Sequence, residues 1–363
     1  MSVENLEKDI LQIGRQAKEA SRYVSQLSTS SKNNILCSAA ENLLKNKDTI
    51  LKANELDIKE NKDKLNSATL DRLILDNKGI ESISNGLEEI SKLEDPVGKI
   101  IENWLRPNGL KIEKISIPLG VIGVIYESRP NVSADAAGLC LKSGNALILR
   151  GGSESFHSSS KIVEIINRSY ENFKLPKGVL QYIPTKDRNA VGHLLTMDNY
   201  VDVIIPRGGR SLIERVINES KVHVIRHLDG ICHTYIHKSS IPNLSKDVVI
   251  NAKMRRPGIC GATETILIDK EVLSTHLPDI IKSFTEMNCE VRGDEHVLGI
   301  NNSLKLANEE DWHTEYLDKI VSIKTILKGV EEAVNHINRY GSGHTDAILS
   351  EDEDAVNFFL NNV

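Results

Sequence analysis

The chain has 363 residues, of which 40% are hydrophobic and 26% charged, with a formal net charge of -6. This length is sufficient for two domains, and the composition is that of a folded protein rather than a disordered one. The acidic balance argues against a general nucleic-acid binder, because such proteins are usually basic.

Targeting and metal-binding signals are missing from the sequence. The N-terminus lacks the basic and apolar regions of a signal peptide, and no apolar run approaches the roughly 18 residues of a membrane span. The five cysteines include no CxxC pair, and the eleven histidines include no HExxH motif. We therefore expect a cytoplasmic protein with no metal site and no nucleic-acid or membrane partner.

Residues 1 to about 95 are expected to be helical, since apolar residues such as Leu6, Ile10 and Ile13 recur at helical spacing. A hairpin arm is expected next, over about 104–118, with Asn108-Gly109 as a two-residue turn. Because an exposed arm offers unpaired strand edges, we expect it to serve a homo-oligomer.

From residue 121 to about 226, short apolar runs alternate with helical segments, and a second such unit follows. This order predicts an α/β fold in which helices cover both faces of a parallel sheet. Ligands of such sheets bind at the carboxyl ends of the strands. The expected fold is thus two doubly wound parallel-sheet domains, over 1–228 and 229–350, with the β-hairpin arm protruding from the first.

Cys260 is the strongest candidate for chemistry. A helix is expected to run into Pro257-Gly258, which breaks it, and the cysteine follows between small residues. Arg255 and Arg256 stand close enough in sequence to favour the thiolate, which is the nucleophilic form. The alternative is a buried structural cysteine. The other four cysteines lie in apolar or helical contexts, and we interpret them as structural: Cys37, Cys140, Cys232 and Cys289.

Asn131 follows the first strand of the predicted parallel sheet, in the segment Glu127-Ser128-Arg129-Pro130-Asn131. Its side chain could cap the next helix, which taken alone is the favoured reading. Its amide could instead donate a hydrogen bond to a developing oxyanion.

Two glycine-containing loops each follow a strand and precede a helix. The first contains Arg150 and Gly151, and the second contains Gly208, Gly209 and Ser211. Each loop could be a plain turn, but glycines next to helix N-termini suit phosphate, and an adjacent arginine suits a 2′-phosphate. The G-x-G-x-x-G fingerprint is absent, which disfavours an ordinary Rossmann dehydrogenase.

Together these segments resemble the gamma-glutamyl phosphate reductase family, also called glutamate-5-semialdehyde dehydrogenase, within the aldehyde dehydrogenase superfamily. The resemblance extends over essentially the whole chain. It is carried by the motifs IPLGVIGVIYESRPNV, LILRGGSES, IIPRGGRSLI, RRPGIC and AVNHINRYGSGHTDAI. The last motif holds the following residues in the family's order: Ala333, His336, Ile337, Gly341, Ser342, His344, Asp346 and Ile348.

The resemblance implies the reduction of L-glutamate 5-phosphate by NADPH to L-glutamate 5-semialdehyde, with release of phosphate, in the second step of proline synthesis. It implies that Cys260 is the nucleophile that forms a thioester and that Asn131 helps to form the oxyanion hole. It places Arg150 at the adenosine ribose, and Gly208, Gly209 and Ser211 at the cofactor phosphates. Candidates for gripping the substrate are Arg255, Arg256, His344 and Asp346.

Two departures from related enzymes bear on this reading. Hydrolytic aldehyde dehydrogenases carry a Glu-Leu-Gly-Gly motif, whereas the matching stretch here is His227-Leu228-Asp229-Gly230, which would spare the thioester from hydrolysis. Family members also continue beyond the equivalent of residue 363, so residues 351–363 are expected to begin a truncated return segment that would complete the arm and the oligomer. The alternative functions are an aldehyde dehydrogenase of other specificity and a non-catalytic nucleotide-binding chain.

Overall fold

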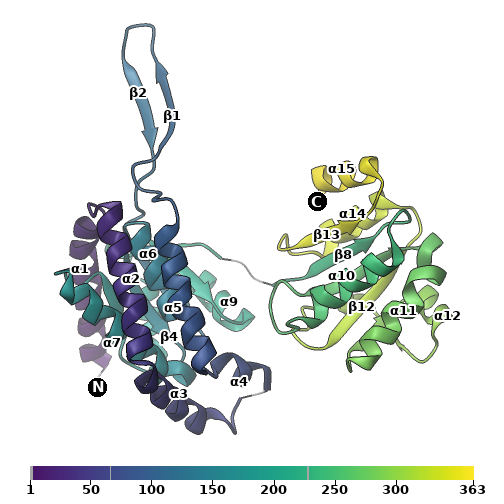
Figure 1. Ribbon diagram of the computed structural model, residues 1–363, viewed down its shortest axis with the longest axis horizontal. Helices are drawn as coiled ribbons and strands as arrows, with labels where there is room; N and C mark the ends of the chain where they lie inside the picture. The colour runs from purple at the N-terminus through teal and green to yellow at the C-terminus, as the bar shows by residue number, and fades with distance from the viewer. Residues whose placement is uncertain (1–2, 66, 227–228) are drawn as a thin grey trace. The chain divides into compact units, whose positions relative to one another are not determined.

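The computed structural model describes residues 3–65, 67–226 and 229–363. It divides into two compact units, residues 1–227 and 228–363. Each unit contains its own parallel sheet with helices on both faces (Figure 1). The predicted fold class, two doubly wound α/β units with a hairpin arm, is therefore confirmed. Among the described residues, no helix combines the length and apolar character needed to cross a membrane.

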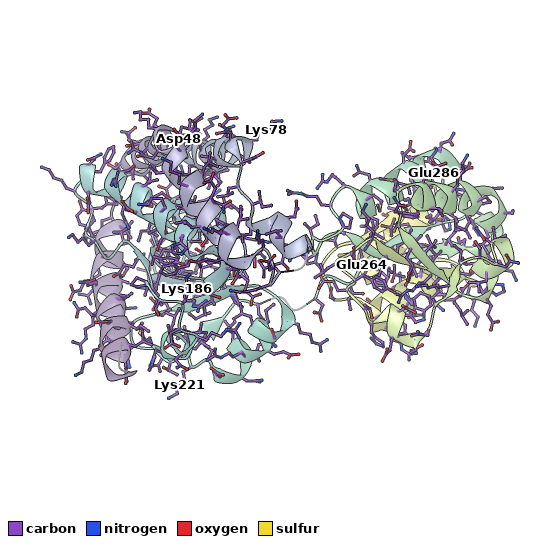
Figure 2. All side chains as sticks on the ribbon, turned by 90° about the horizontal axis from the view of Figure 1, so that it is seen from below. Asp48, Lys78, Lys186, Lys221, Glu264 and Glu286 are labelled. Carbon is purple, nitrogen blue, oxygen red and sulfur yellow. The ribbon has the colours of Figure 1, made fainter. Side chains whose placement is uncertain are left out.

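The N-terminal part is helical as predicted. Asp76 and Ser28 accept hydrogen bonds from backbone N–H groups three residues on, which fixes two of the helix starts. Charged residues such as Asp48 and Lys78 are exposed on these helices (Figure 2). The helices are α1 Val3–Val24, α2 Thr29–Lys45, α3 Lys47–Asn61, α4 Ser67–Leu73 and α5 Asn77–Lys92.

The arm is an antiparallel pair of strands, β1 Ile100–Leu105 and β2 Lys111–Ile115 (Figure 1). The prediction of a two-residue turn is wrong, because Arg106 and Leu110 still pair through the Arg106 N–H at 2.9 Å and leave a three-residue loop. Pro107 suits the first central position of a type I turn, and Gly109 follows with φ +83. This is the usual geometry of a three-residue hairpin.

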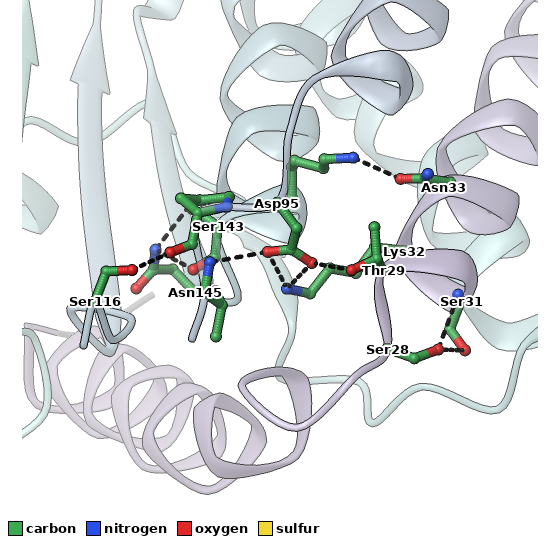
Figure 3. A network of polar contacts seen from close by, with 12 residues as sticks. Ser28, Thr29, Ser31, Lys32, Asn33, Asp95, Ser116, Ser143 and Asn145 are labelled. Carbon is green, nitrogen blue, oxygen red and sulfur yellow. Dashed lines mark hydrogen bonds and ion pairs between the residues drawn. The ribbon is translucent and has the colours of Figure 1, made fainter. Parts of the chain in front are cut away.

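A polar network lies at the base of the arm (Figure 3). The Lys32 ammonium is fully buried and lies 2.9 Å from the Asp95 carboxylate. Asp95 also accepts hydrogen bonds from Thr29 and from the backbone N–H of Val97. These bonds connect α2 to the segment that leads into β1.

The sheet of the first unit has the order β5-β4-β3-β6-β7, with every neighbouring pair parallel. Every residue of β3 and β4 is buried, which explains why their sequences are apolar apart from Arg150 near the end of β4. The strands are β3 Val121–Tyr126, β4 Ala146–Gly151, β5 Leu180–Tyr182, β6 Val203–Arg207 and β7 His223–Val224.

Two hydrophobic clusters cover the faces of this sheet. One joins α2, α5, α6 and α7 to side chains such as Leu147 and Leu149, and the other joins α1, α8 and α9 to side chains such as Ile148. Successive residues of β4 thus point to opposite faces, as in any strand. The helices not yet given are α6 Val132–Lys142, α7 Phe156–Asn172, α8 Asn189–Leu195 and α9 Arg210–Glu219, with a 3-10 turn at Ser153–Ser155.

The second unit contains a six-stranded parallel sheet of order β11-β10-β12-β9-β8-β13. The strands are β8 Cys232–Ile236, β9 Thr263–Asp269, β10 Glu290–Gly293, β11 Lys305–Leu306, β12 Ile320–Ile326 and β13 Asp346–Leu349. The helices are α10 Pro242–Met254, α11 Leu273–Glu286, α12 Glu295–Ile300, α13 Glu309–Trp312, α14 Val330–Tyr340 and α15 Glu353–Asn362, with a 3-10 turn at Lys270–Val272.

Candidate active site

Cys260 lies on an irregular turn between the end of α10 at Met254 and the start of β9 at Thr263. The turn is closed by backbone hydrogen bonds from Ile259 to Arg256 and from Ala262 to Ile259. Cys232, the first residue of β8, pairs with Thr263. The cysteine therefore lies at the amino ends of β8 and β9, opposite to the edge where ligands of parallel sheets usually bind.

The backbone of Cys260 is held from two sides. A Cβ on Gly230 would lie only 2.7 Å from the Cys260 carbonyl carbon, so Gly230 allows the two backbones to approach. The Cys232 thiol donates a hydrogen bond to the Cys260 carbonyl oxygen at 3.0 Å. Burial raises the pKa of Cys232 to about 12, which keeps this thiol protonated as a donor.

The five cysteines, all among the described residues, fall into two groups. Cys140, Cys232 and Cys289 are buried. Burial raises the pKa of Cys140 to about 12 and that of Cys289 to about 11, so both stay inert as thiols. Cys260 is partly exposed and Cys37 is exposed on α2. The interpretation of Cys260 as merely a buried cysteine is therefore wrong.

The segment between α14 and β13 lies against this turn. Ser342 accepts a hydrogen bond from the backbone N–H of Ile231 at 2.9 Å. His344 Nδ1 lies 3.7 Å from Cys232 Sγ, and its Cε1 lies 3.8 Å from where a Cβ on Gly261 would be. Residues more than 80 positions apart in sequence thus surround the cysteine turn.

The four candidate substrate residues lie in different environments. His344 is exposed next to the turn, and Arg255 and Arg256 are exposed at its beginning. The Asp346 side chain is only 5% exposed, and its Oδ1 accepts hydrogen bonds from the backbone and ring nitrogens of His233, each at 3.0 Å. Asp346, the first residue of β13, therefore orients the ring of His233 in β8.

In the first unit, Asn131 begins α6 without a side-chain cap hydrogen bond, so the capping alternative is wrong. Its amide instead donates to the Asp135 carboxylate at 3.0 Å. Burial raises the pKa of Asp135, and the Asn131 hydrogen bond opposes that rise. An amide nitrogen carries two hydrogens, so one remains for another acceptor.

Arg150 is buried at the end of β4. Its guanidinium donates to the carbonyl oxygen of Gly151 at 2.7 Å and reaches those of Lys186 and Asp187 at 3.4 Å. Burial lowers its pKa. A Cβ on Gly151 would lie 2.9 Å from Tyr182 Oη, so internal packing already accounts for this glycine.

The loop after β6 is exposed at Gly208, Gly209 and Ser211. Glu127, which follows β3, accepts a hydrogen bond from the Gly209 N–H at 2.8 Å. A Cβ on Gly208 would lie 2.6 Å from the same carboxylate oxygen. The N-terminus of α9 therefore already holds an anionic group supplied by the protein.

These loops lie at the carboxyl ends of β3, β4 and β6, where doubly wound sheets bind nucleotides. Arg150 Nε and Tyr182 Oη are buried polar atoms without a hydrogen-bond partner in the described structure. Together with the exposed loop at the start of α9, they fit a phosphate-bearing cofactor if Glu127 releases the Gly209 N–H. Among the described residues, no cluster of three or more His, Cys, Asp or Glu could hold a metal ion.

Sequence reasoning missed several contacts of the site. The sequence marks Gly230 only as part of the stretch His227-Leu228-Asp229-Gly230, of which His227 and Leu228 lie outside the described residues. The local sequence of Cys232 predicts a structural cysteine, and no local pattern gives Glu127 a role. The motif around Ser342 was the available signal that this distant segment belongs to the site.

Comparisons with known proteins assign the chain to a family. The model of the aldehyde dehydrogenase family matches residues 4–299. A gamma-glutamyl phosphate reductase from Paramagnetospirillum magneticum is 47% identical over 362 residues, which are 99% of this chain and 85% of that protein. One from Brucella anthropi is 48% identical over 97% of this chain and 83% of its own length.

Solved structures agree with this assignment. The gamma-glutamyl phosphate reductase of Thermotoga maritima has a TM-score of 0.92 at 35% identity, over 98% of this chain and 86% of that one. A glyceraldehyde-3-phosphate dehydrogenase from Methanocaldococcus jannaschii, complexed with NADP, has a TM-score of 0.71 at 15% identity over 98% and 84% of the chains, which shows the shared fold alone. The chain therefore belongs to the gamma-glutamyl phosphate reductases, a branch of the aldehyde dehydrogenase family of nicotinamide-dependent oxidoreductases.

Proposed function

We propose that this protein catalyses the NADPH-dependent reduction of L-glutamate 5-phosphate to L-glutamate 5-semialdehyde, with release of phosphate, through a thioester on Cys260. The main support is the partly exposed thiol on a turn whose backbone is held by Gly230 and Cys232. The name shared by relatives about half identical over nearly the whole chain supports the substrate.

In this proposal the Cys260 thiolate attacks the acyl carbon of the substrate. The bond from that carbon to the phosphate oxygen breaks, phosphate leaves with the electron pair, and a thioester remains on Cys260. Phosphate is a good leaving group, so the step needs little acid catalysis. The free N–H of the Asn131 amide is the proposed donor to the developing oxyanion.

The first unit is proposed to hold the cofactor. Arg150 and Gly151 would lie at the adenosine ribose, and Gly208, Gly209 and Ser211 at the phosphates. A bound NADPH supplies the hydride that reduces the acyl group to the aldehyde. Arg150 supports NADPH over NADH. To bind the 2′-phosphate, its guanidinium must give up its hydrogen bond to the carbonyl oxygen of Gly151.

The substrate's charged groups are proposed to meet His344, Arg255 and Arg256, which are exposed on or next to the cysteine turn. Asp346 acts through His233 in this account. No glutamate occurs in the stretch 227–230 that aligns with the water-activating motif of hydrolytic relatives. The thioester is therefore left for reduction rather than hydrolysis.

This activity is the second step of proline synthesis from glutamate, and the proposed location of the protein is the cytoplasm. The exposed arm, in which all six residues of β1 are exposed, is proposed to contribute to a homo-oligomer.

The assay that tests this function runs the reaction in reverse. Purified protein should reduce NADP with glutamate 5-semialdehyde only when phosphate is present, because phosphate must cleave the thioester. Turnover without phosphate would instead support a hydrolytic aldehyde dehydrogenase. Cofactor binding without any turnover would indicate a nucleotide-binding chain without catalysis.

A further inference from the structure

A fully buried ion pair lies next to the Cys260 turn. Lys253, in the last turn of α10, lies with its Nζ 2.5 Å from Glu264 Oε2, and both side chains are 0% exposed. Glu264 belongs to β9 and is labelled in Figure 2. The pair therefore connects the helix before the cysteine turn to the strand after it.

The strand pairing gives Glu264 a special position. Cys232 of β8 pairs with Thr263 of β9, but the next residue, His233, pairs with Thr265. Glu264 is thus the extra residue of a β-bulge. Bulges redirect a side chain and are frequent next to active sites. The local backbone is shaped so that this carboxylate reaches Lys253.

A third segment meets the same pair. The backbone N–H of Leu317 lies 3.3 Å from Glu264 Oε1, so each carboxylate oxygen has its own donor. The Lys253 ammonium also lies 5.9 Å from the centre of the Tyr316 ring. Contacts from three parts of the chain therefore fix both charged groups.

A buried ion pair of this kind contributes little net stability. Removing two charges from water costs about as much as their attraction returns, and apolar pairs of similar volume are often equally stable. Burial raises the pKa of Glu264 to about 7 even though the charge and hydrogen bond of Lys253 act to lower it, which shows how costly the carboxylate charge is in this position. Stability therefore does not explain why these two charged residues are here.

We propose that Lys253 and Glu264 are positioning residues, which hold the two ends of the Cys260 turn at a fixed separation so that the thiol meets the substrate in reactive geometry. This inference rests on the proposed role of Cys260 as nucleophile. Neither residue touches the substrate in this account. A shift of about 1 Å in a reacting atom can lower a rate by about 100-fold, so a small change in the turn is enough to matter.

The decisive variant replaces both charges by apolar residues of similar volume, Lys253→Met with Glu264→Leu. We expect it to melt near the wild-type temperature but to lose about tenfold or more in kcat. The KM for semialdehyde and the Kd for NADPH should stay within about twofold, because binding groups are untouched. Alkylation of Cys260 by iodoacetamide, followed by peptide mass spectrometry, should show a changed rate in the absence of any substrate.

A matched control exists in the first unit. Lys32 is also fully buried and paired with a carboxylate, at 2.9 Å from Asp95, but it belongs to the other unit. Lys32→Met and Lys253→Met each remove the buried ammonium that pairs with a carboxylate, and both should lower the melting temperature. Only Lys253→Met should change the alkylation rate of Cys260.

Three results would overturn the proposal. The double variant could retain the wild-type kcat and the wild-type rate of Cys260 alkylation. Its KM could rise while its kcat stays at the wild-type value. Lys32→Met could change the rate of Cys260 alkylation as much as Lys253→Met does. If the double variant does not fold, Lys253→Met is judged by its kcat, KM and Cys260 alkylation rate, with Lys32→Met as the control for lost stability. Failure of the proposed function is separate, because it would show as turnover by Cys260→Ser.

Discussion

The Cα of Gly230 lies against the main chain of Cys260 so closely that a methyl group there would lie 2.7 Å from the carbonyl carbon and 2.8 Å from the Cα of the cysteine. The obstacle is backbone rather than a flexible side chain, so the turn itself would have to move. Contact between these two residues, 30 positions apart (260 − 230), therefore fixes where the thiol lies.

Gly230→Ala tests this contact. We expect a destabilisation of about 1–3 kcal/mol from overpacking and a fall in kcat of up to about 100-fold because the thiol is displaced. Thermal melting and steady-state kinetics measure the two effects. Gly299→Ala in the same unit is the matched control, since a Cβ there meets no atom within 4 Å. Wild-type kcat in Gly230→Ala would show that the turn tolerates movement.

The thiol of Cys232 gives a second prediction. Cys232→Ala removes the donor to the Cys260 carbonyl, which should cost about 1 kcal/mol of stability and lower kcat severalfold. Cys232→Ser keeps a donor at this position and should recover much of the activity. The kinetics of the two variants are compared under one set of conditions. Equal activities of the serine and alanine variants would mean that the hydrogen bond has no role in catalysis.

Acid stability tests the pair at the base of the arm. Burial acts to raise the pKa of Asp95, but the hydrogen bonds from Val97, Lys32 and Thr29 outweigh it and hold that pKa below its usual 3.8. A carboxyl group whose pKa is lower in the folded than in the unfolded state stabilises the folded protein at pH values above its unfolded pKa. This contribution to stability is lost as the pH falls through the folded pKa. Asp95→Asn should therefore cost about 3 kcal/mol at neutral pH, because Lys32 stays buried without a countercharge.

That cost should begin to shrink below about pH 4, where Asp95 becomes protonated in the unfolded chain while it is still ionised in the folded protein, and it should shrink further as the pH approaches the lower folded pKa. Urea unfolding of both proteins between pH 3 and pH 7 measures the difference. A difference that stays constant over this range would mean that Asp95 does not titrate with folding.

Glu127 gives a prediction for cofactor binding. Its carboxylate accepts the Gly209 N–H, at the helix N-terminus where the cofactor phosphates are proposed to bind. Two anionic groups repel each other there, so Glu127→Gln should lower the Kd for NADPH by a factor of about five, equivalent to about 1 kcal/mol. Fluorescence titration of NADPH measures it. Weaker binding by the variant would indicate that Glu127 holds the loop in its binding shape.

Much of the architecture could be predicted because burial leaves a direct trace in the sequence. Strands β3 and β4 are buried on both faces, and both are therefore apolar apart from Arg150 near the end of β4. Strand β10 leaves no such trace, because its residues alternate, with Val291 buried and Glu290 and Arg292 paired to each other at 2.8 Å. A short strand of this kind has the local composition of a loop.

The candidate site shows the same limit. Pro257-Gly258 before Cys260 marks a helix end and a turn by local rules, so the nucleophile position could be predicted. The contact with Gly230, the thiol donor Cys232 and the carboxylate of Glu264 depend on which strands lie next to each other. Strand order in a parallel sheet is a property of the whole chain, and local sequence does not contain it.

The most direct test of the account is a single-turnover experiment in the reverse direction, with semialdehyde and NADP but without phosphate. Oxidation should stop after a burst of about one NADPH per active chain, because the thioester has no acceptor. Mass spectrometry should then find a glutamyl group on the peptide that contains Cys260, and added phosphate should release it and restart turnover. A missing burst, or an acyl group on any other residue, would contradict the central claim that Cys260 carries the reaction.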